Sequence, residues 1–196
     1  MKKIILLLSL ALCSTAVCWS NDVAAAGNKT PQYPFYQSYI ELSGRMTSPL
    51  SGGGALDMIN GCRLNKYVFI GGGVGVTSYF LYQDINNYRE MISTPLYADI
   101  RAYAPVRSSN VSPYIETAVG PLFNYYGYVV SADEIPHLDG PTNYYTKAYF
   151  KIGLGIDIID RITIGAGYEL WGDENNVMDF GFLKLGVRIG QDKNVY

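Results

Sequence analysis

The feature that most constrains this chain is a two-residue alternation between apolar side chains and small or charged ones. In residues 150–158 the even positions are Phe, Ile, Leu, Ile and Ile, whereas the odd positions are Lys, Gly, Gly and Asp. Residues 162–170 and 183–190 repeat the pattern. Because successive side chains of a strand point to opposite faces, the alternation predicts strands with one apolar face and one mixed polar face.

Eight segments carry such strand-like patterns, and turn-forming residues separate them. The predicted strands are 35–47, 53–64, 67–82, 91–105, 112–128, 144–158, 162–171 and 178–190. Most have ten or more residues, whereas strands of soluble proteins usually have about five or six. A strand that crosses a membrane needs about 9–11 residues. We therefore expect an all-β chain that forms an eight-stranded, antiparallel, up-and-down transmembrane β-barrel.

The predicted connections alternate between short turns and longer, more polar links. The short turns are 65–66, 106–111 and 159–161, and the longer links are 48–52, 83–90, 129–143 and 172–177. Outer-membrane barrels show this asymmetry, with short periplasmic turns and longer external loops. Because the strand number is even, both termini are expected on the periplasmic side.

The N-terminus has the features of a signal peptide. Lys2 and Lys3 precede an apolar run, 4–12, and small residues before positions 16 and 26 offer two cleavage sites. We predict a signal peptide over 1–26, with cleavage after 16 or 26, followed by one barrel domain over 27–196. Cleavage after 26 leaves Cys62 as the single cysteine, which cannot form an internal disulfide or a zinc site.

Composition excludes several other classes of protein. Charged residues make up 16% of the chain, against about 25% in an average soluble domain. After residue 30 no apolar run approaches the about 18 residues that indicate a transmembrane helix. The formal net charge is −2, and no basic stripe is present, so nothing favours nucleic-acid binding.

The polar face of the strands decides between two orientations of the barrel wall. In a soluble barrel the apolar face packs inward, whereas in a membrane barrel it meets lipid and the polar face fills the lumen. The polar face carries six acids and six bases, a balance that suits a closed interior because an unpaired buried charge costs several kcal/mol. We predict that these residues form a structural charge network in a plugged lumen: Glu41, Arg45, Asp57, Arg63, Asp99, Arg101, Glu116, Lys151, Asp157, Glu169, Lys184 and Arg188.

Glycines and aromatic residues support the membrane orientation. Glycines on the predicted lumen face leave room for long side chains, at positions 71, 73, 75, 153, 155, 165 and 167. Aromatic residues near strand ends are expected to form girdles at the level of the lipid headgroups. These are Tyr33, Phe35, Tyr36, Tyr79, Phe80, Tyr82, Phe123, Tyr125, Tyr126, Tyr128, Tyr144, Tyr145 and Trp171.

Several stretches resemble a known family. Residues 64–67 (LNKY), 71–76 (GGGVGV), 95–101 (PLYADIR) and 112–120 (SPYIETAVG) look like the short outer-membrane β-barrel domain family, which is similar in architecture to the OmpA transmembrane domain and OmpX. The resemblance covers nearly the whole mature chain. It implies export, assembly by the barrel-assembly machinery, residence in outer-membrane lipid, and a function that is usually undefined.

Catalytic chemistry has little support in the sequence. The glycine run 71–75 lies within a predicted strand and no Lys-Ser/Thr follows it, so it is not a phosphate loop. A lipid A-modifying enzyme would need a His beside a Ser and an acid. The one histidine is His137, and residues near it in the chain are Ser131, Asp133, Glu134 and Asp139. We interpret it as a solvated loop histidine and predict no cofactor and no metal.

The predicted function is therefore structural or interactive, without catalysis and without an open pore. Segment 129–143 is the longest link and the expected surface for contacts with extracellular proteins or surfaces. Two alternatives stay open from the sequence: a lipid A-modifying outer-membrane enzyme, and a soluble periplasmic ligand-binding barrel.

Overall fold

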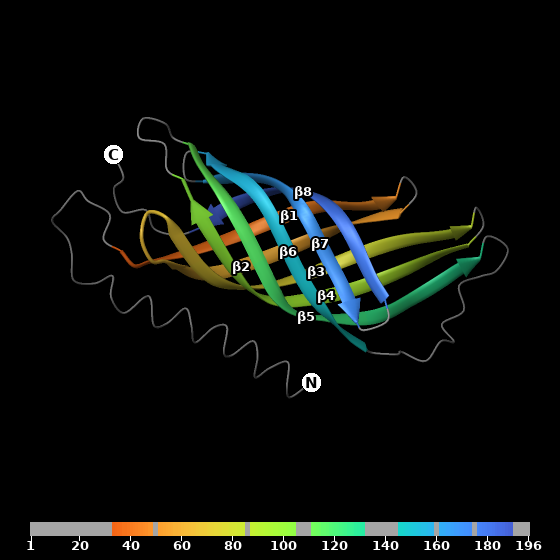
Figure 1. Cartoon of the computed structure of the whole chain (residues 1–196). Coiled ribbons are helices and arrows are strands. Elements are labelled where there is room, and N and C mark those ends of the chain that lie inside the picture. Colours follow the sequence, from red (N-terminus) through yellow and green to blue (C-terminus); the bar gives the residue numbers. More distant parts are fainter. Residues whose placement is uncertain are drawn as a thin grey trace.

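The chain folds into a closed barrel (Figure 1). The computed structural model describes residues 33–48, 51–84, 87–104, 111–131, 145–158, 161–173 and 176–189. Its strands are β1 (Phe35–Ser48), β2 (Ser51–Arg63), β3 (Val68–Asp84), β4 (Asn87–Tyr103), β5 (Val111–Ser131), β6 (Tyr145–Ile158), β7 (Ile162–Asp173) and β8 (Asn176–Ile189). Each strand pairs antiparallel with its neighbours in chain order, and β8 pairs with β1. All eight predicted strands are confirmed. Within the described ranges, no helix is long and apolar enough to cross a membrane.

The two ends of the barrel differ in the connections that they carry. At the end that we call the turn end, β1 begins and β8 ends, and the register pairs Ser38 with Ile189. Residues 64–67 connect β2 to β3 at the same end. The opposite end, the loop end, carries the links from β1 to β2, β3 to β4, β5 to β6, and β7 to β8.

At the loop end the strands continue further than the sequence predicts. The links that remain between strand ends are 49–50, 85–86, 132–144 and 174–175. The prediction of longer links at this end is therefore wrong for three of the four, and residues 129–131 of the predicted loop 129–143 belong to β5. Polar and glycine residues weaken the side-chain alternation, but they do not stop the ladder, because its hydrogen bonds join main-chain groups.

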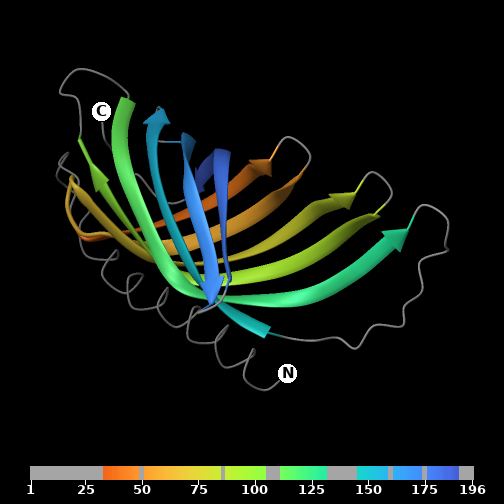
Figure 2. The ribbon, with the colours of Figure 1, turned by 45° about the vertical axis from the view of Figure 1, so that its right-hand side comes forward.

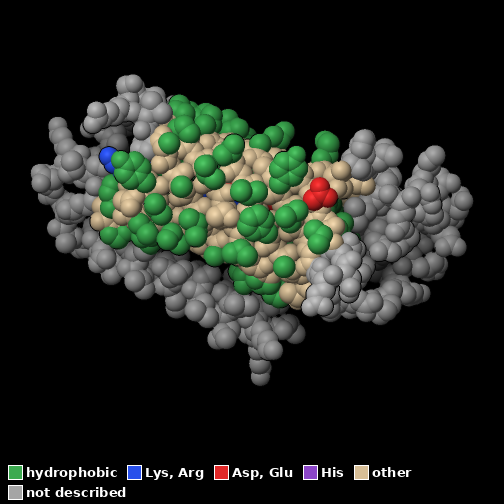
Figure 3. All heavy atoms as spheres, viewed as in Figure 1, with side chains coloured by type: hydrophobic (Ala, Val, Ile, Leu, Met, Phe, Trp, Pro, Cys, Tyr) green, Lys and Arg blue, Asp and Glu red, His purple; other side chains and the backbone are tan. Residues whose placement is uncertain are grey.

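The outer surface of the barrel wall is apolar. Leu42, Leu154 and Leu183 are 62%, 64% and 71% exposed on it. Hydrophobic side chains are scattered over the whole described part of the face seen in Figure 3, where few charged side chains are visible. The alternate residues of each strand point into the lumen, where Lys151 and Glu169 are buried. The two faces of the strands thus separate as the alternation predicts.

Glycines on the lumen face make room for large side chains from neighbouring strands. A Cβ atom at Gly73 would collide with the ring of Tyr97, and one at Gly155 would collide with the ring of Tyr114. A Cβ atom at Gly153 would lie 2.9 Å from Glu116 Oε1. The predicted space-making role of the lumen glycines is confirmed at these positions.

The N-terminal segment is not among the described residues. The predicted signal peptide, 1–26, and both of its candidate cleavage sites therefore stay predictions. Cys62 is disulfide-bonded in this structure, whereas the prediction of a single cysteine without an internal disulfide applies to the chain after cleavage. The other cysteines, Cys13 and Cys18, fall in the undescribed segment.

Candidate functional site

The lumen of the barrel brings the predicted charged residues together. Eleven of the twelve are at most 6% exposed, and Arg188, near the end of β8, is half-buried. Such burial is tolerated only when charges are paired and hydrogen-bonded. The contacts separate these residues into a central group, a second group nearer the loop end, and a few residues near the turn end.

Arg101, on β4, is the hub of the central group. Its Nε lies 2.9 Å from Asp99 Oδ1 on the same strand, and its Nη2 lies 2.9 Å from Glu41 Oε1 on β1. The same nitrogen is 3.6 Å from Glu116 Oε2 on β5. The guanidinium carbon also lies 4.2 Å from the centre of the Tyr39 ring. One cation is thus shared by three carboxylates and an aromatic face.

Two lysines complete the central group. Lys184 Nζ, on β8, donates to Glu41 Oε2 at 2.9 Å and also to Glu116. Lys151 Nζ, on β6, lies 3.7 Å from Glu116 Oε1. We call Glu41, Asp99, Arg101, Glu116, Lys151 and Lys184 the central network. It joins five strands across the lumen, and each of Glu41 and Glu116 contacts more than one cation.

The second group centres on one ion pair. Arg45, on β1, contacts Glu169, on β7, through two nitrogens at 2.8 Å each. Arg45 also donates to the hydroxyl of Thr77, and its Nη2 is 3.7 Å from Asp57 Oδ2. The hydroxyl of Tyr149 donates to Glu169 at 3.0 Å. We call Arg45 and Glu169 the Arg45 pair, since their ion pair is the closest contact between charged groups in this part of the lumen.

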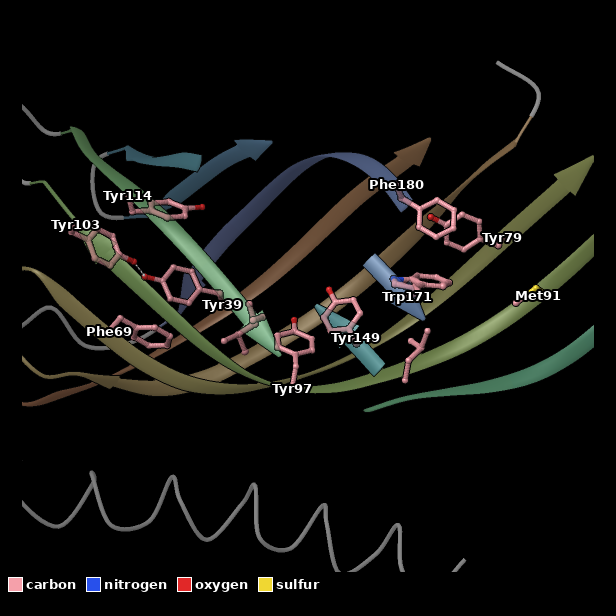
Figure 4. Close-up of a cluster of buried hydrophobic side chains, with 13 residues drawn as sticks. Tyr39, Phe69, Tyr79, Met91, Tyr97, Tyr103, Tyr114, Tyr149, Trp171 and Phe180 are labelled. Atoms are coloured by element: carbon pink, nitrogen blue, oxygen red, sulfur yellow. Dashed lines mark hydrogen bonds between the residues drawn. The ribbon is translucent and has the colours of Figure 1, made fainter. Parts of the chain in front are cut away.

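Buried aromatic rings lie along the lumen, with one group toward each end of the barrel (Figure 4). Near the turn end Tyr103 and Tyr114 lie 5.3 Å apart between ring centres, and Tyr39 packs edge-on against Phe69 at 5.5 Å. Near the loop end the mutually packed rings are Tyr79, Trp171 and Phe180, with centre distances of 4.3 to 4.8 Å.

The aromatic rings at the loop end correct one prediction. Tyr79 and Trp171 are each 1% exposed, so they do not belong to a headgroup girdle. Their parity gives the reason, because Tyr79 shares the lumen face with Thr77, and Trp171 shares it with Glu169. The sequence argument also missed the lumen role of Phe180, although it lies two positions before Phe182 on the same face and is fully buried.

Near the turn end two of the predicted charged residues make other contacts. The hydroxyl of Tyr39 lies 3.4 Å from Asp157 Oδ2. The Gln37 amide, oriented so that its oxygen accepts, takes a hydrogen bond from Arg188 Nη1 at 2.8 Å. Asp157 and Arg188 therefore lie apart from the central network and the Arg45 pair.

Arg63 also lies near the turn end. Its guanidinium stacks on the Tyr103 ring, with its central carbon 3.6 Å from the ring centre. It also donates to main-chain carbonyls of the connection 64–67. That the twelve charged residues act together to hold the barrel closed stays a proposal.

The predicted loop histidine, His137, and the acids near it in the sequence fall in 132–144, outside the described residues. The lipid A-modifying enzyme therefore stays an alternative. Among the described residues, no group of His, Cys, Asp and Glu is arranged to hold a metal ion.

A small sheet projects beyond the barrel at the loop end. The ladder between β2 and β3 stops at Gly52 and Phe80, and that between β5 and β6 stops at Asn124 and Tyr145. Beyond these pairs β3, β4 and β5 continue together, to Asn87 opposite Ser131. We call residues 81–84, 87–92 and 125–131 the projecting sheet. Figure 2 shows β3, β4 and β5 reaching past the hairpin of β7 and β8.

A closed eight-stranded antiparallel barrel with a charged lumen and an apolar exterior is the architecture of small outer-membrane β-barrels. The chain has this fold. Among solved structures it is similar to Neisserial surface protein A (NspA), with 19% identity, a TM-score of 0.51, and coverage of 80% of this chain and 96% of that chain.

Two further solved structures match at lower similarity. The N-terminal barrel domain of Pseudomonas aeruginosa OprF is 14% identical over 78% of this chain and 97% of that chain, with a TM-score of 0.45. The outer membrane enzyme PagL is 11% identical over 79% and 99%, also with a TM-score of 0.45. No protein-family model matches the sequence, and no curated protein matches it.

Proposed function

We propose that the chain is an integral outer-membrane barrel with both termini in the periplasm, which anchors an interaction surface and performs no catalysis. The distribution of charge on the exterior carries this proposal. Of the described residues, twenty-eight large hydrophobic side chains are exposed. Where side chains are described, which excludes 81–90, 126–131 and 173–176, the exposed charged ones are Lys66 and Arg161 at the turn end and Asp179 toward the loop end. The described wall between them is an uncharged belt.

An uncharged belt bounded by charges is what a bilayer requires of a protein surface. A charge on the lipid-facing side of a membrane barrel costs about 2–4 kcal/mol at the bilayer midplane and much less near the interfaces. A soluble barrel has the reverse arrangement, with its apolar side chains inside. The observed polarity therefore opposes the alternative of a soluble periplasmic ligand-binding barrel.

The orientation of the wall can be tested by paired substitutions. Leu154→Arg on the exterior should lower the free energy of unfolding from lipid vesicles by about 2–4 kcal/mol, because it places a charge in hydrocarbon. Thr163→Ser in the lumen should change it little, because serine keeps the hydroxyl that lies 2.6 Å from the Tyr114 hydroxyl. Urea titrations in phospholipid vesicles measure both values.

Two results would overturn the membrane proposal. One is equal, small effects of the Leu154 and Thr163 substitutions. The other is a purified mature chain that stays folded and monodisperse in buffer without detergent or lipid.

The projecting sheet supports an interaction role. Residues 126–131 of β5 pair with β4 on one side, and among the described strands none pairs with their other side. The edge of a strand presents main-chain donors and acceptors to another extended chain.

The interaction role predicts that a proline in the projecting sheet weakens partner binding. Val129→Pro would remove one main-chain donor in the projecting sheet, and it should weaken capture of an extracellular partner by intact cells without changing the amount of folded barrel. Folded barrel is measured by its altered mobility on unheated SDS gels. Partner capture that is unchanged while the sheet is disrupted would refute this role.

The lumen supports the absence of an open pore. Its buried side chains include the central network, the Arg45 pair and the aromatic rings at both ends. Planar-bilayer recordings should show no stable channel at moderate voltage, and steady single-channel steps would contradict the proposal.

The lipid A-modifying alternative is tested by His137→Ala. Lipid A that changes in mass between wild type and variant would establish the enzyme.

The route to the membrane is also proposed. We expect removal of 1–26 or 1–16 and insertion by the barrel-assembly machinery. N-terminal sequencing of the membrane-extracted protein identifies the cleavage site. A mature protein that begins at Met1 would refute the signal peptide.

A further inference from the structure

Two exposed basic side chains lie at the turn end of the barrel. At the turn end Lys66, in the connection between β2 and β3, and Arg161, before β7, are both exposed. The described acid near this end is Asp157, which is 2% exposed and lies in the lumen. The exposed charges described at the turn end are therefore both positive.

Contacts around Lys66 hold its segment in place without neutralising it. Lys66 Nζ lies 4.8 Å from the centre of the Tyr67 ring, which is half exposed. The Lys66 carbonyl accepts a hydrogen bond from Arg63 Nη2 at 2.8 Å. No carboxylate of the described residues is recorded within 4.0 Å of the side-chain nitrogens of Lys66 or Arg63. A lysine beside a tyrosine at the edge of an apolar belt is the arrangement expected at a headgroup layer.

Arg161, the second exposed base of the turn end, lies in the connection between β6 and β7. Its carbonyl accepts from the main-chain N–H of Arg188 at 2.7 Å, and its own N–H donates to Ile158 at 3.1 Å. These bonds fix the backbone and leave the exposed guanidinium for other contacts. β7, β8, β1, β2 and β3 are consecutive around the barrel, so Lys66 and Arg161 are separated along the rim.

The connections at the turn end do not offset this charge in sequence. Residues 105–110, 159–160 and 190–196 contain two basic residues, Arg107 and Lys193, and two acidic residues, Asp160 and Asp192. Their formal side-chain charges cancel, and residues 27–32, which precede β1 in the chain, add one further base, Lys29.

We propose that the turn end binds the phosphate groups of anionic phospholipids, with Lys66 and Arg161 as the contacting side chains. The inference rests on the proposed membrane location. The two cations are spread along the rim instead of converging on one point, which suits a surface of many phosphates better than one free phosphate ion. Basic residues beside a bilayer attract anionic lipid over about a Debye length. Binding of this kind would also favour insertion with the turn end toward the leaflet that holds such lipids.

The test measures lipid selectivity in a formed bilayer. The mature chain is reconstituted in phosphatidylcholine vesicles that contain trace spin-labelled phosphatidylglycerol or spin-labelled phosphatidylcholine. Electron paramagnetic resonance then gives the association of each labelled lipid with the barrel. At low salt the wild type should prefer phosphatidylglycerol by about threefold. K66Q/R161Q should reduce the ratio to near one, whereas the matched control D179N should retain it.

Each outcome bears on a separate statement. A ratio near one in the wild type, or a threefold ratio that K66Q/R161Q leaves unchanged, overturns the lipid-binding inference. Loss of the preference when inorganic phosphate replaces chloride at constant ionic strength assigns the site to free phosphate and also overturns it. A chain that fails to enter phosphatidylcholine vesicles refutes the membrane proposal instead, because insertion into neutral lipid does not depend on Lys66 or Arg161.

Discussion

The central network and the Arg45 pair place similar charges in the same lumen but connect them differently. Arg101 touches three carboxylates, and Glu116 touches three cations. Arg45 relies on one bidentate partner, Glu169, with Asp57 farther away at 3.7 Å. A shared network can redistribute its contacts when one member is lost, whereas a pair cannot. Tolerance to charge removal should therefore differ within one barrel.

The largest effect is expected from Glu169→Ala. It leaves Arg45 buried with only Asp57 and the Thr77 hydroxyl as partners, and breaking a buried pair costs about 3–5 kcal/mol. The free energy of unfolding from lipid vesicles, measured by urea titration, should fall by that amount. Glu169→Gln keeps an acceptor for the Tyr149 hydroxyl and should cost less. A loss below about 1 kcal/mol for Glu169→Ala would show that the pair matters little.

A smaller effect is expected from Glu41→Ala in the central network. Arg101 would retain Asp99 and Glu116, and Lys184 would retain Glu116, so a loss of about 1–3 kcal/mol is expected, the range for removing one partner of a buried hydrogen bond. The same vesicle titration applies. If Glu41→Ala proves as costly as Glu169→Ala, the contrast between network and pair fails.

The smallest effect is expected when both members of the pair are replaced together. R45M/E169L removes both charges and fills similar volume, and such replacements of buried ion pairs are often neutral or stabilising. Stability should stay within about 1.5 kcal/mol of wild type, far from the sum of the single losses. A double variant that is as unstable as Glu169→Ala would mean that the site needs charge for another reason.

Much of this architecture could be predicted from the sequence. Alternation identified the eight strands and the lumen face, because every second residue shares a face whatever the tertiary contacts. The partners within the lumen could not be predicted. Arg45 meets Glu169 six strands later in the chain because β1 and β7 lie two apart around the closed barrel and their register sets the same height. That height depends on the stagger of the whole sheet, which single-strand patterns do not contain.

The sequence-based predictions were wrong where a residue's position near a strand end conflicted with the face on which the alternation places it. Tyr79 and Trp171 lie near strand ends, which favours a girdle, but their parity places them inside, and parity prevails because the strand continues past them. The loop-end links were overestimated for the same reason, since polar residues near strand ends still join the ladder. The solvated loop histidine, His137, and the contact surface around it stay predictions, because 132–144 lies outside the described residues.

The central network draws residues from strands that are far apart in the chain, and this affects how the barrel assembles. Glu41 comes from the first strand, Arg101 from the fourth and Lys184 from the last. In an open, partly formed sheet these groups remain hydrated and apart, so their mutual attraction contributes only once the first and last strands meet. Closure should therefore add the contacts of Glu41 and Lys184 in one step, and a chain lacking its final hairpin should retain only the contacts among β4, β5 and β6.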